Sequence, residues 1–339
     1  MVLNKEKRRF FVFRLVTILL SLIVVFLSLE ISLRIFGPRY YEFNNNSNEY
    51  YTNPRGYHIP IRKEGRDIIY GLNYIYDERG YRLPDKSCSE KANKKNSEIF
   101  ILGLGDSFTF GQGVKYGDIY LTILEDLLNQ GGLRVFIRNC GLNGLDTEAV
   151  LETYIRESSQ TEYSLVIYGF VLNDFGLSGP EISGNNLLDF SNGKYSFNAL
   201  RKICLVYNFF CYLTEKRKLH TITVKAYLDA FTGKSAEEKF KVLGSLNQKI
   251  EAKKSKLVIL LFPLLYNFNN YQFREIHHKI SSFCKSNDII LLDLLPEFSK
   301  YKAEDLWVNP TDHHPNEIAH RIAAKKLYEI LNRNKLLYN

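Results

Sequence analysis

Apolar segments of strand length alternate with amphipathic segments from residue 98 to near the C-terminus. The apolar runs are short and nearly continuous, whereas the segments between them have helical periodicity. The expected strands are 99–104, 134–139, 164–171, 256–264 and 288–294, and the expected helices are 118–130, 146–159, 235–254, 271–286 and 316–332. Continuous apolar strands separated by helices are typical of a parallel sheet covered on both faces. The pattern therefore predicts a doubly wound α/β/α sandwich, with its site beyond the carboxyl ends of the strands.

The N-terminus has a different pattern, a single long apolar stretch that follows a basic segment. Residues 10–29 contain one charge, Arg14, and as a helix they are about 30 Å long, enough to cross a bilayer. A cleaved signal peptide would need a shorter apolar core and small residues at its cleavage site, yet the first alanine is Ala92. A buried core helix would not need basic residues at one end only. Residues 1–36 are therefore predicted to be a cytoplasmic N-terminus and an uncleaved, single-pass anchor, with the rest outside the cell membrane.

The segment between the anchor and the α/β region is polar. Residues 37–95 are rich in Asn, Tyr, Arg and Gly, and they are predicted to form a linker with a short hairpin in "DIIYGLNYIYDERGYRLPD". The catalytic domain is expected to cover residues 96–335. Residues 175–234 interrupt the alternation of strands and helices, and they are predicted to be an insertion that shapes substrate access.

The charge and the cysteines exclude two classes of protein. The formal net charge is +8, but residues 1–14 carry half of it and the remainder shows no basic stripe. Nucleic acid is therefore not an expected partner, since phosphate tracking needs clustered Lys and Arg. The five cysteines are scattered, odd in number and without a CxxC pair, so they predict no disulfide framework.

Polar residues with possible chemistry follow the first strand. Ser107 lies in "GLGDSFTFGQG", where its hydroxyl would be presented at the edge of the sheet and the N–H groups of the turn would face an oxyanion. Gly-Asp-Ser is also ordinary turn composition. The stretch is not a GxSxG elbow, because Thr109 occupies the position of the second glycine, and no Gly-Lys-Ser/Thr phosphate loop follows.

Two further strand ends carry similar signals. Gly141 and Gly144 in "NCGLNGLDT" allow backbone N–H groups to approach a ligand, although a plain strand-to-helix turn has the same composition. In "GFVLNDF", Asn173 has an amide that can donate to a developing negative charge, and Asp174 can cap or brace the loop. An Asx turn is the alternative interpretation of this pair.

The stretch "DHHPNEIAH" precedes the last predicted helix. In an extended segment, side chains two residues apart share one side, so Asp312 pairs with His314 and His313 faces away. Pro315 is expected in the first turn of the helix, whose buried stripe is predicted to be Ile318, Ile322, Leu327 and Leu331. A catalytic zinc would need three protein ligands, and no other histidine has a suitable spacing, so no metal is expected.

Together these four stretches resemble the four conserved blocks of the SGNH (GDSL-type) hydrolases, over residues 98–333. The resemblance implies a flavodoxin-like three-layer fold, Ser107 as nucleophile, His314 as general base and Asp312 as the residue that orients it. It also implies three oxyanion donors, namely the backbone N–H of Ser107, Gly144 and Asn173. The third block departs from the family pattern, because Val171 stands in place of a glycine. His320, near the end of the last block, is expected to pack or cap.

The resulting functional hypothesis is a membrane-anchored serine esterase that needs no cofactor. Serine requires a base within hydrogen-bond reach to become a nucleophile, and the four blocks supply one. Placement outside the membrane suggests an acylated glycan or a lipid of the cell envelope as substrate. An O-acyltransferase of cell-surface polysaccharide is an alternative, since a sugar hydroxyl can resolve the same acyl-enzyme. A non-catalytic envelope binding protein is the other, although all four blocks retain reactive residue types.

Overall fold

The computed structural model describes residues 5–36, 50–52, 58–60, 65–69, 72–84, 97–175, 204–207, 224–309 and 312–337. Their contacts divide the chain into two units. The larger unit comprises residues 43–182 and 223–339, and the smaller comprises residues 1–42 and 183–222.

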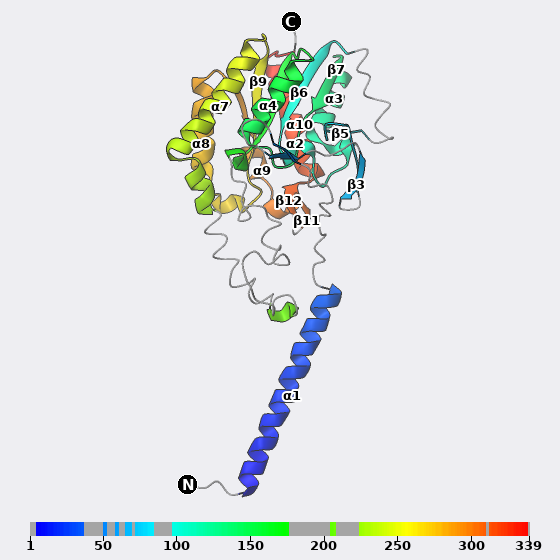
Figure 1. Cartoon of the computed structure of the whole chain (residues 1–339), viewed down its shortest axis with the longest axis vertical. Helices are drawn as coiled ribbons and strands as arrows, with labels where there is room; N and C mark the ends of the chain where they lie inside the picture. Colours follow the sequence, from blue (N-terminus) through cyan, green and yellow to red (C-terminus); the bar gives the residue numbers. More distant parts are fainter. Residues whose placement is uncertain are drawn as a thin grey trace. The chain divides into compact units, whose positions relative to one another are not determined.

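The larger unit is built on a five-stranded parallel sheet with the strand order β10-β9-β8-β6-β7. Strands β9, β6 and β7 of this sheet are labelled in Figure 1. The strand of this sheet that comes first in the chain, β6, is internal; β7 pairs with one of its edges and β8, β9 and β10 continue from the other. This is the doubly wound, flavodoxin-like order, and its switch point lies between β6 and its two neighbours. The strands are β6 (Ile99–Gly105), β7 (Val135–Asn139), β8 (Leu165–Val171), β9 (Lys256–Phe262) and β10 (Ile290–Asp293).

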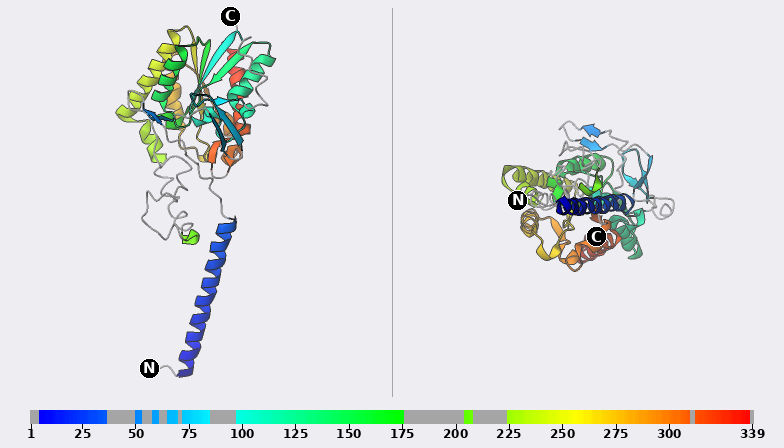
Figure 2. Two further views of the ribbon diagram at one scale, coloured as in Figure 1. Left: turned by 45° about the vertical axis from the view of Figure 1, so that its right-hand side comes forward. Right: turned by 90° about the horizontal axis from the view of Figure 1, so that it is seen from below.

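Helices cover both faces of this sheet, so the predicted three-layer sandwich is confirmed (Figure 2). One layer contains α3 (Tyr120–Gln130) packed on α10 (Glu317–Arg333). The other contains α4 (Thr147–Ser158), α7 (Gly233–Glu251) and α8 (Arg274–Ser286). Short helices η2 (Tyr116–Asp118), η5 (Phe268–Asn270), α9 (Leu295–Phe298) and η6 (Ala303–Leu306) lie in the connections. Every residue of β8 is buried, as expected for a central strand between two helical layers.

The start of α10 differs from the prediction. Asn316 is the N-cap, and its side-chain oxygen accepts hydrogen bonds from the N–H groups of Ile318 and Ala319, so Pro315 precedes the helix rather than entering its first turn. Ile318, predicted to be buried, is 44% exposed. Leu327 and Leu331 are buried as predicted and Ile322 is partly buried. Small residues occupy the rest of the buried face and allow α10 to pack closely on α3. That face consists of Ala319, His320, Ala323, Ala324, Leu327 and Leu331.

A small antiparallel sheet, β3 (Gly65–Ile69), β4 (Leu72–Tyr76) and β5 (Arg82–Leu83), braces the loop that follows Ser107. The buried Arg82 guanidinium donates hydrogen bonds to the carbonyls of Gly111 (2.5 Å) and Val114 (2.6 Å), and it stacks 4.0 Å from the Tyr74 ring. The N–H of Gly113 donates to the Tyr74 hydroxyl at 2.7 Å. These bonds fix the loop 111–114. Strands β1 (Tyr50–Thr52) and β2 (His58–Pro60) form a separate antiparallel pair.

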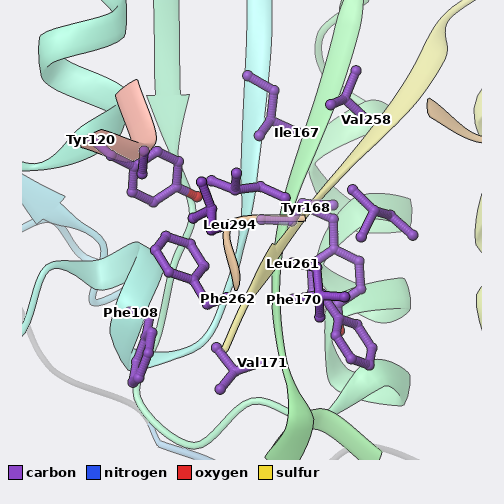
Figure 3. Close-up of a cluster of buried hydrophobic side chains, with 14 of the residues drawn as sticks. Phe108, Tyr120, Ile167, Tyr168, Phe170, Val171, Val258, Leu261, Phe262 and Leu294 are labelled. Carbon is purple, nitrogen blue, oxygen red and sulfur yellow. The ribbon is translucent and has the colours of Figure 1, made fainter. Parts of the chain in front are cut away.

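The aromatic side chains of Phe108, Tyr120 and Phe262 gather in a buried cluster (Figure 3). Phe108 contacts Phe262 edge to face, with ring centroids 5.5 Å apart, and Phe262 contacts Tyr120 at 5.6 Å. Edge-to-face pairs contribute about 0.5–1.5 kcal/mol beyond their buried area. The residue after Ser107 is therefore anchored in the core, which restricts movement of the serine.

In the smaller unit, α1 (Lys5–Phe36) contains 28 residues, Arg8–Ile35, that are long and apolar enough to cross a membrane. A signal sequence passes the same test. Near the end of this span, the Glu30 carboxylate pairs with Arg34 at 2.7 Å and accepts the backbone N–H groups of Leu205 (3.1 Å) and Val206 (2.9 Å). Most of the expected insertion, residues 175–234, lies outside the described residues.

Candidate active site

The candidate nucleophile lies where β6 meets the short helix α2 (Ser107–Phe110). Asp106 caps this helix, and its carboxylate accepts the N–H of Phe108 at 2.9 Å. Gly105 has a φ of 147°, and a Cβ there would lie 2.2 Å from Thr109 Oγ1 and 2.6 Å from the carbonyl of Gly169. Only glycine therefore allows β6 to turn so close to β8. Ser107 emerges from this turn 8% exposed.

The structure brings Ser107, His314 and Asp312 together. The Ser107 Oγ lies 2.8 Å from His314 Nε2, and His314 Nδ1 makes a short hydrogen bond to Asp312 Oδ1. The N–H of His314 also donates to Asp312 Oδ1 at 3.0 Å. An ionised carboxylate only accepts hydrogen bonds, so in the neutral imidazole Nδ1 carries the proton and Nε2 can accept one from the serine. The arrangement is that of a serine, a base and the acid that orients the base.

A two-stranded antiparallel ribbon, β11 (Trp307–Asn309) and β12 (Asp312–Pro315), separates the roles of the adjacent histidines. Extended residues alternate in direction, which places Asp312 and His314 on one side. His313 instead stacks on Trp307, with ring centroids 3.8 Å apart and an interplanar angle of 15°. The Trp307 indole N–H donates to the carbonyl of Leu265 at 2.8 Å, so this stack is held in place.

The expected oxyanion donors lie at the carboxyl ends of the strands on either side of β6. Gly144 is in the turn between β7 and α4 with a φ of 76°, and among the described residues only its chain neighbours come within 4 Å of where its Cβ would be. Asn173 is in η3 (Leu172–Phe175), directly after β8, and its side-chain amide donates to Asp106 Oδ2 at 3.2 Å. Asp106 therefore holds the Asn173 amide beside the turn that carries Ser107.

Val171, in place of the family's glycine, fits the end of β8 without distortion. It pairs in register with Phe262 of β9 and is 1% exposed. Its N–H donates to the Asp174 carboxylate at 3.2 Å, and the Tyr168 hydroxyl donates to the same oxygen at 2.8 Å. Asp174 thus braces the loop that carries Asn173. Burial raises the pKa of Asp174 well above its ordinary value.

The charges around His314 favour its protonated form. Burial lowers the pKa of the imidazole, but the charge of Asp312, the hydrogen bond to Asp312 and the charge of Asp106 outweigh burial. The net pKa is raised above the ordinary value of 6.5. Burial also raises the pKa of Asp106, against the hydrogen bonds from Phe108 and Asn173.

This shift predicts the acid limb of the pH–rate profile. His314 accepts a proton only when it is neutral, so kcat/KM should rise with pH through a pKa above 6.5. Asp312→Asn removes the charge that contributes most to the raised pKa of His314. The residual activity of this variant should therefore rise at a lower pH than that of the wild type. Hydrolysis of an acyl ester by both proteins, followed from pH 5 to 9, measures the two limbs. A flat profile, or the same limb in both proteins, would contradict the assignment of His314 as the base.

Two other buried histidines contact tyrosine side chains. His277 bonds to Asp293 through Nδ1 at 2.9 Å and to the Tyr271 hydroxyl through Nε2 at 3.1 Å. That hydroxyl also accepts the N–H of Leu264, so the group links α8 to the end of β9. His320 stacks on Tyr120, and burial lowers its pKa to about 3. A histidine–acid pair alone is therefore not specific to the site; the serine distinguishes the pair at His314.

The sequence alone did not predict two residues that contact the site, Asp106 and Gln112. Asp106 holds both the nucleophile turn and Asn173, and Gln112 contacts the oxygen of Asp312 that faces away from His314. Both lie inside the quoted stretch "GDSFTFGQG", but the sequence does not tell which side chains of that stretch turn inward. Among the described residues, no group of three or more His, Cys, Asp or Glu side chains is arranged to hold a metal ion.

No family model and no curated protein matches the chain. Several solved structures are similar to it. TesA is 14% identical, with 70% of this chain and 99% of that chain covered and a TM-score of 0.46. The psychrotrophic esterase EstA from Pseudoalteromonas sp. is 15% identical, with 70% and 99% covered and a TM-score of 0.45. A member of the lipolytic protein G-D-S-L family from Veillonella parvula DSM 2008 is 15% identical, with 69% and 99% covered and a TM-score of 0.41.

Proposed function

We propose that the chain is a serine esterase of the SGNH type that hydrolyses acyl esters through a covalent intermediate on Ser107. The observation that carries the proposal is the 2.8 Å contact between Ser107 Oγ and His314 Nε2, with Asp312 behind the imidazole. Serine hydroxyls are poor nucleophiles at neutral pH unless a base takes their proton. A binding protein would have no need of an imidazole nitrogen directed at a serine hydroxyl.

The first half of the reaction follows from this geometry. His314 Nε2 takes the proton of Ser107 as Oγ attacks the ester carbonyl, and the charge of Asp312 stabilises the imidazolium that forms. When the tetrahedral intermediate collapses, the imidazolium returns the proton to the departing alcohol. The ester bond is broken, and the acyl group is left on Ser107. Water then attacks the acyl-enzyme while His314 takes its proton. When the second tetrahedral intermediate collapses, His314 returns that proton to Ser107 Oγ and the free acid is released.

N–H groups at the edge of the sheet would donate hydrogen bonds to the oxyanion of the intermediate. The donors are the backbone N–H of Ser107 at the start of α2, the N–H of Gly144 and the side-chain amide of Asn173. Each such donor lowers the barrier by about 3 kcal/mol when it is pre-oriented. Asp106 orients one of them, since it holds the Asn173 amide at 3.2 Å.

The proposed substrates are acyl esters of envelope glycans or lipids. The experiment is a screen of the detergent-solubilised full chain against acetylated glycans and against short- and long-chain acyl esters, with and without a glycan acceptor. Release of free acid supports hydrolysis. Gain of acyl groups by the acceptor would instead assign an O-acyltransferase, because a sugar hydroxyl would have resolved the acyl-enzyme. If neither turnover nor an acyl-enzyme were detected, the result would favour a non-catalytic binding protein.

We also propose that α1 is retained as a single-pass anchor, with the α/β unit on the extracytoplasmic side. The basic residues before the apolar span favour a cytoplasmic N-terminus. The Glu30 contacts with the backbone at 205 and 206 support retention, because a removed signal peptide would take Glu30 with it.

The anchor has a direct test. A phosphatase that is active only outside the cytoplasm, fused after residue 40, should be active and should remain in the membrane fraction at the full mass of the fusion. The same fusion with the basic residues of segment 1–14 changed to Gln should lose its uniform orientation. Release of a shortened, soluble reporter would establish cleavage, and an inactive reporter would reverse the topology.

A further inference from the structure

Gln112 lies in a backbone segment that is fixed on both sides. Its own N–H donates to the carbonyl of Ser107 at 3.1 Å, so it belongs to the turn that closes the nucleophile helix. Its neighbours Gly111 and Gly113 have φ values of 79° and 86°, and a Cβ on Gly113 would lie 2.4 Å from Val308. Arg82 and Tyr74 hold the same two glycines through hydrogen bonds.

The side chain of Gln112 is 4% exposed and joins two parts of the site. Its amide nitrogen lies 3.3 Å from Asp312 Oδ2, the oxygen that His314 does not use. Its amide oxygen accepts a hydrogen bond from the Asn143 side chain at 2.9 Å. Asn143 immediately precedes Gly144 in the turn that contains the second expected oxyanion donor. One buried amide thus connects the acid of the triad with the oxyanion turn.

The chemistry of the neighbours sets the orientation of this amide. An ionised Asp312 only accepts hydrogen bonds, so the nitrogen of Gln112 must face it and the oxygen must face Asn143. A flipped amide would bring two acceptor oxygens together at Asp312 and two N–H donors together at Asn143. The nitrogen is also 3.3 Å from His314 Nδ1, but that nitrogen carries its own proton toward Asp312. The hydrogen bonds therefore run in one direction, from Asn143 through Gln112 to Asp312.

We propose that Gln112 is a positioning residue that fixes the Asp312 carboxylate for His314 and couples it to the oxyanion turn through Asn143. This inference rests on the function proposed for Ser107, His314 and Asp312. Without the Gln112 donor, Oδ2 would lose this hydrogen bond and the carboxylate would be held less firmly against Nδ1. The imidazole would then spend less time in the orientation in which Nε2 faces Ser107.

Gln112→Leu tests the proposal because it keeps most of the volume and removes the donor. It should lower kcat for an acyl ester about tenfold, the effect of one hydrogen bond to a buried charge, and leave KM within about twofold. The matched control is Gln248→Leu, the same change on the exposed face of α7, which should not alter kcat. Equal activities of Gln112→Leu and the wild type would overturn the proposal.

A double-mutant cycle separates positioning from a general structural role. The rate of labelling of Ser107 by a fluorophosphonate is measured for the wild type, Gln112→Leu, Asp312→Ala and the double variant. A residue that acts through Asp312 has nothing left to position once that carboxylate is gone. Adding Gln112→Leu to the wild type should therefore slow labelling about tenfold, whereas adding it to the Asp312→Ala variant should slow labelling less than twofold. Equal slowing in both backgrounds would assign Gln112 to the fold alone.

Asn143→Ala provides a second variant if Gln112→Leu does not fold. It removes the donor to the Gln112 oxygen and should lower kcat about threefold, through one neutral hydrogen bond. No change in kcat would refute the coupling to the oxyanion turn. The proposed function fails in a different way, since an unlabelled Ser107 in the wild-type protein would rule out the nucleophile itself. Labelling of the wild type without an effect of Gln112 would refute only the present inference.

Discussion

His314→Ala should lower kcat/KM for an acyl ester on the order of 10⁴-fold or more, while His313→Ala should lower it less than threefold. The two residues are adjacent in the sequence, but only His314 contacts both Ser107 and Asp312. His313 stacks on Trp307 on the other side of the ribbon. Its removal therefore leaves the proton acceptor of the reaction in place.

The comparison controls for the fold because both variants remove an imidazole from the same short strand. Initial rates with a chromogenic acyl ester and urea unfolding of each variant would separate lost chemistry from lost stability. Equal losses in the two variants would show that the pairing of Asp312 with His314 is misassigned. A larger loss for His313→Ala than for His314→Ala would assign the catalytic role to His313.

Ser107→Ala should abolish ester hydrolysis to a similar extent. The acyl group has no oxygen to which it can be transferred, and His314 has no hydroxyl from which to take a proton. The substitution removes a single atom, so the turn held by Asp106 and Gly105 should persist. The two variants should not be additive, because serine and histidine act as one unit.

The matched control for this variant is Ser159→Ala, on the exposed end of α4, which should retain wild-type activity. Burst kinetics with an activated ester would show the acyl-enzyme as a rapid release of about one equivalent of alcohol. Activity that survives in Ser107→Ala and is lost in His314→Ala would indicate that the histidine activates water directly. Such a result would exclude a covalent intermediate on Ser107.

The sheet was predictable because each strand is a compact apolar run with a clear end. All five predicted strands and all five predicted helices are present, with ends shifted by a few residues. A parallel sheet needs strands that are buried on both faces, so hydrophobicity alone identifies them. The position of the site followed from the same pattern, since polar residues at the carboxyl ends of such strands converge at one edge.

The pairing of Asp312 with His314 was predictable from local geometry, because a residue and its second neighbour share one side of an extended segment. Gln112 was not predictable, since its contacts join residues that are 200 and 31 positions away in the chain. The burial of Ala319 and the exposure of Ile318 depend on how closely α10 approaches α3. That distance is a property of the packed pair of helices and not of either sequence.

Intact-mass measurement and peptide mapping after incubation with a fluorophosphonate test most directly whether Ser107 is the nucleophile and His314 activates it. The wild-type chain should gain one phosphonyl group on Ser107, and His314→Ala should label on the order of 10³-fold more slowly or not at all. An adduct on any other residue, or no adduct on a folded wild-type protein, would contradict the assignment.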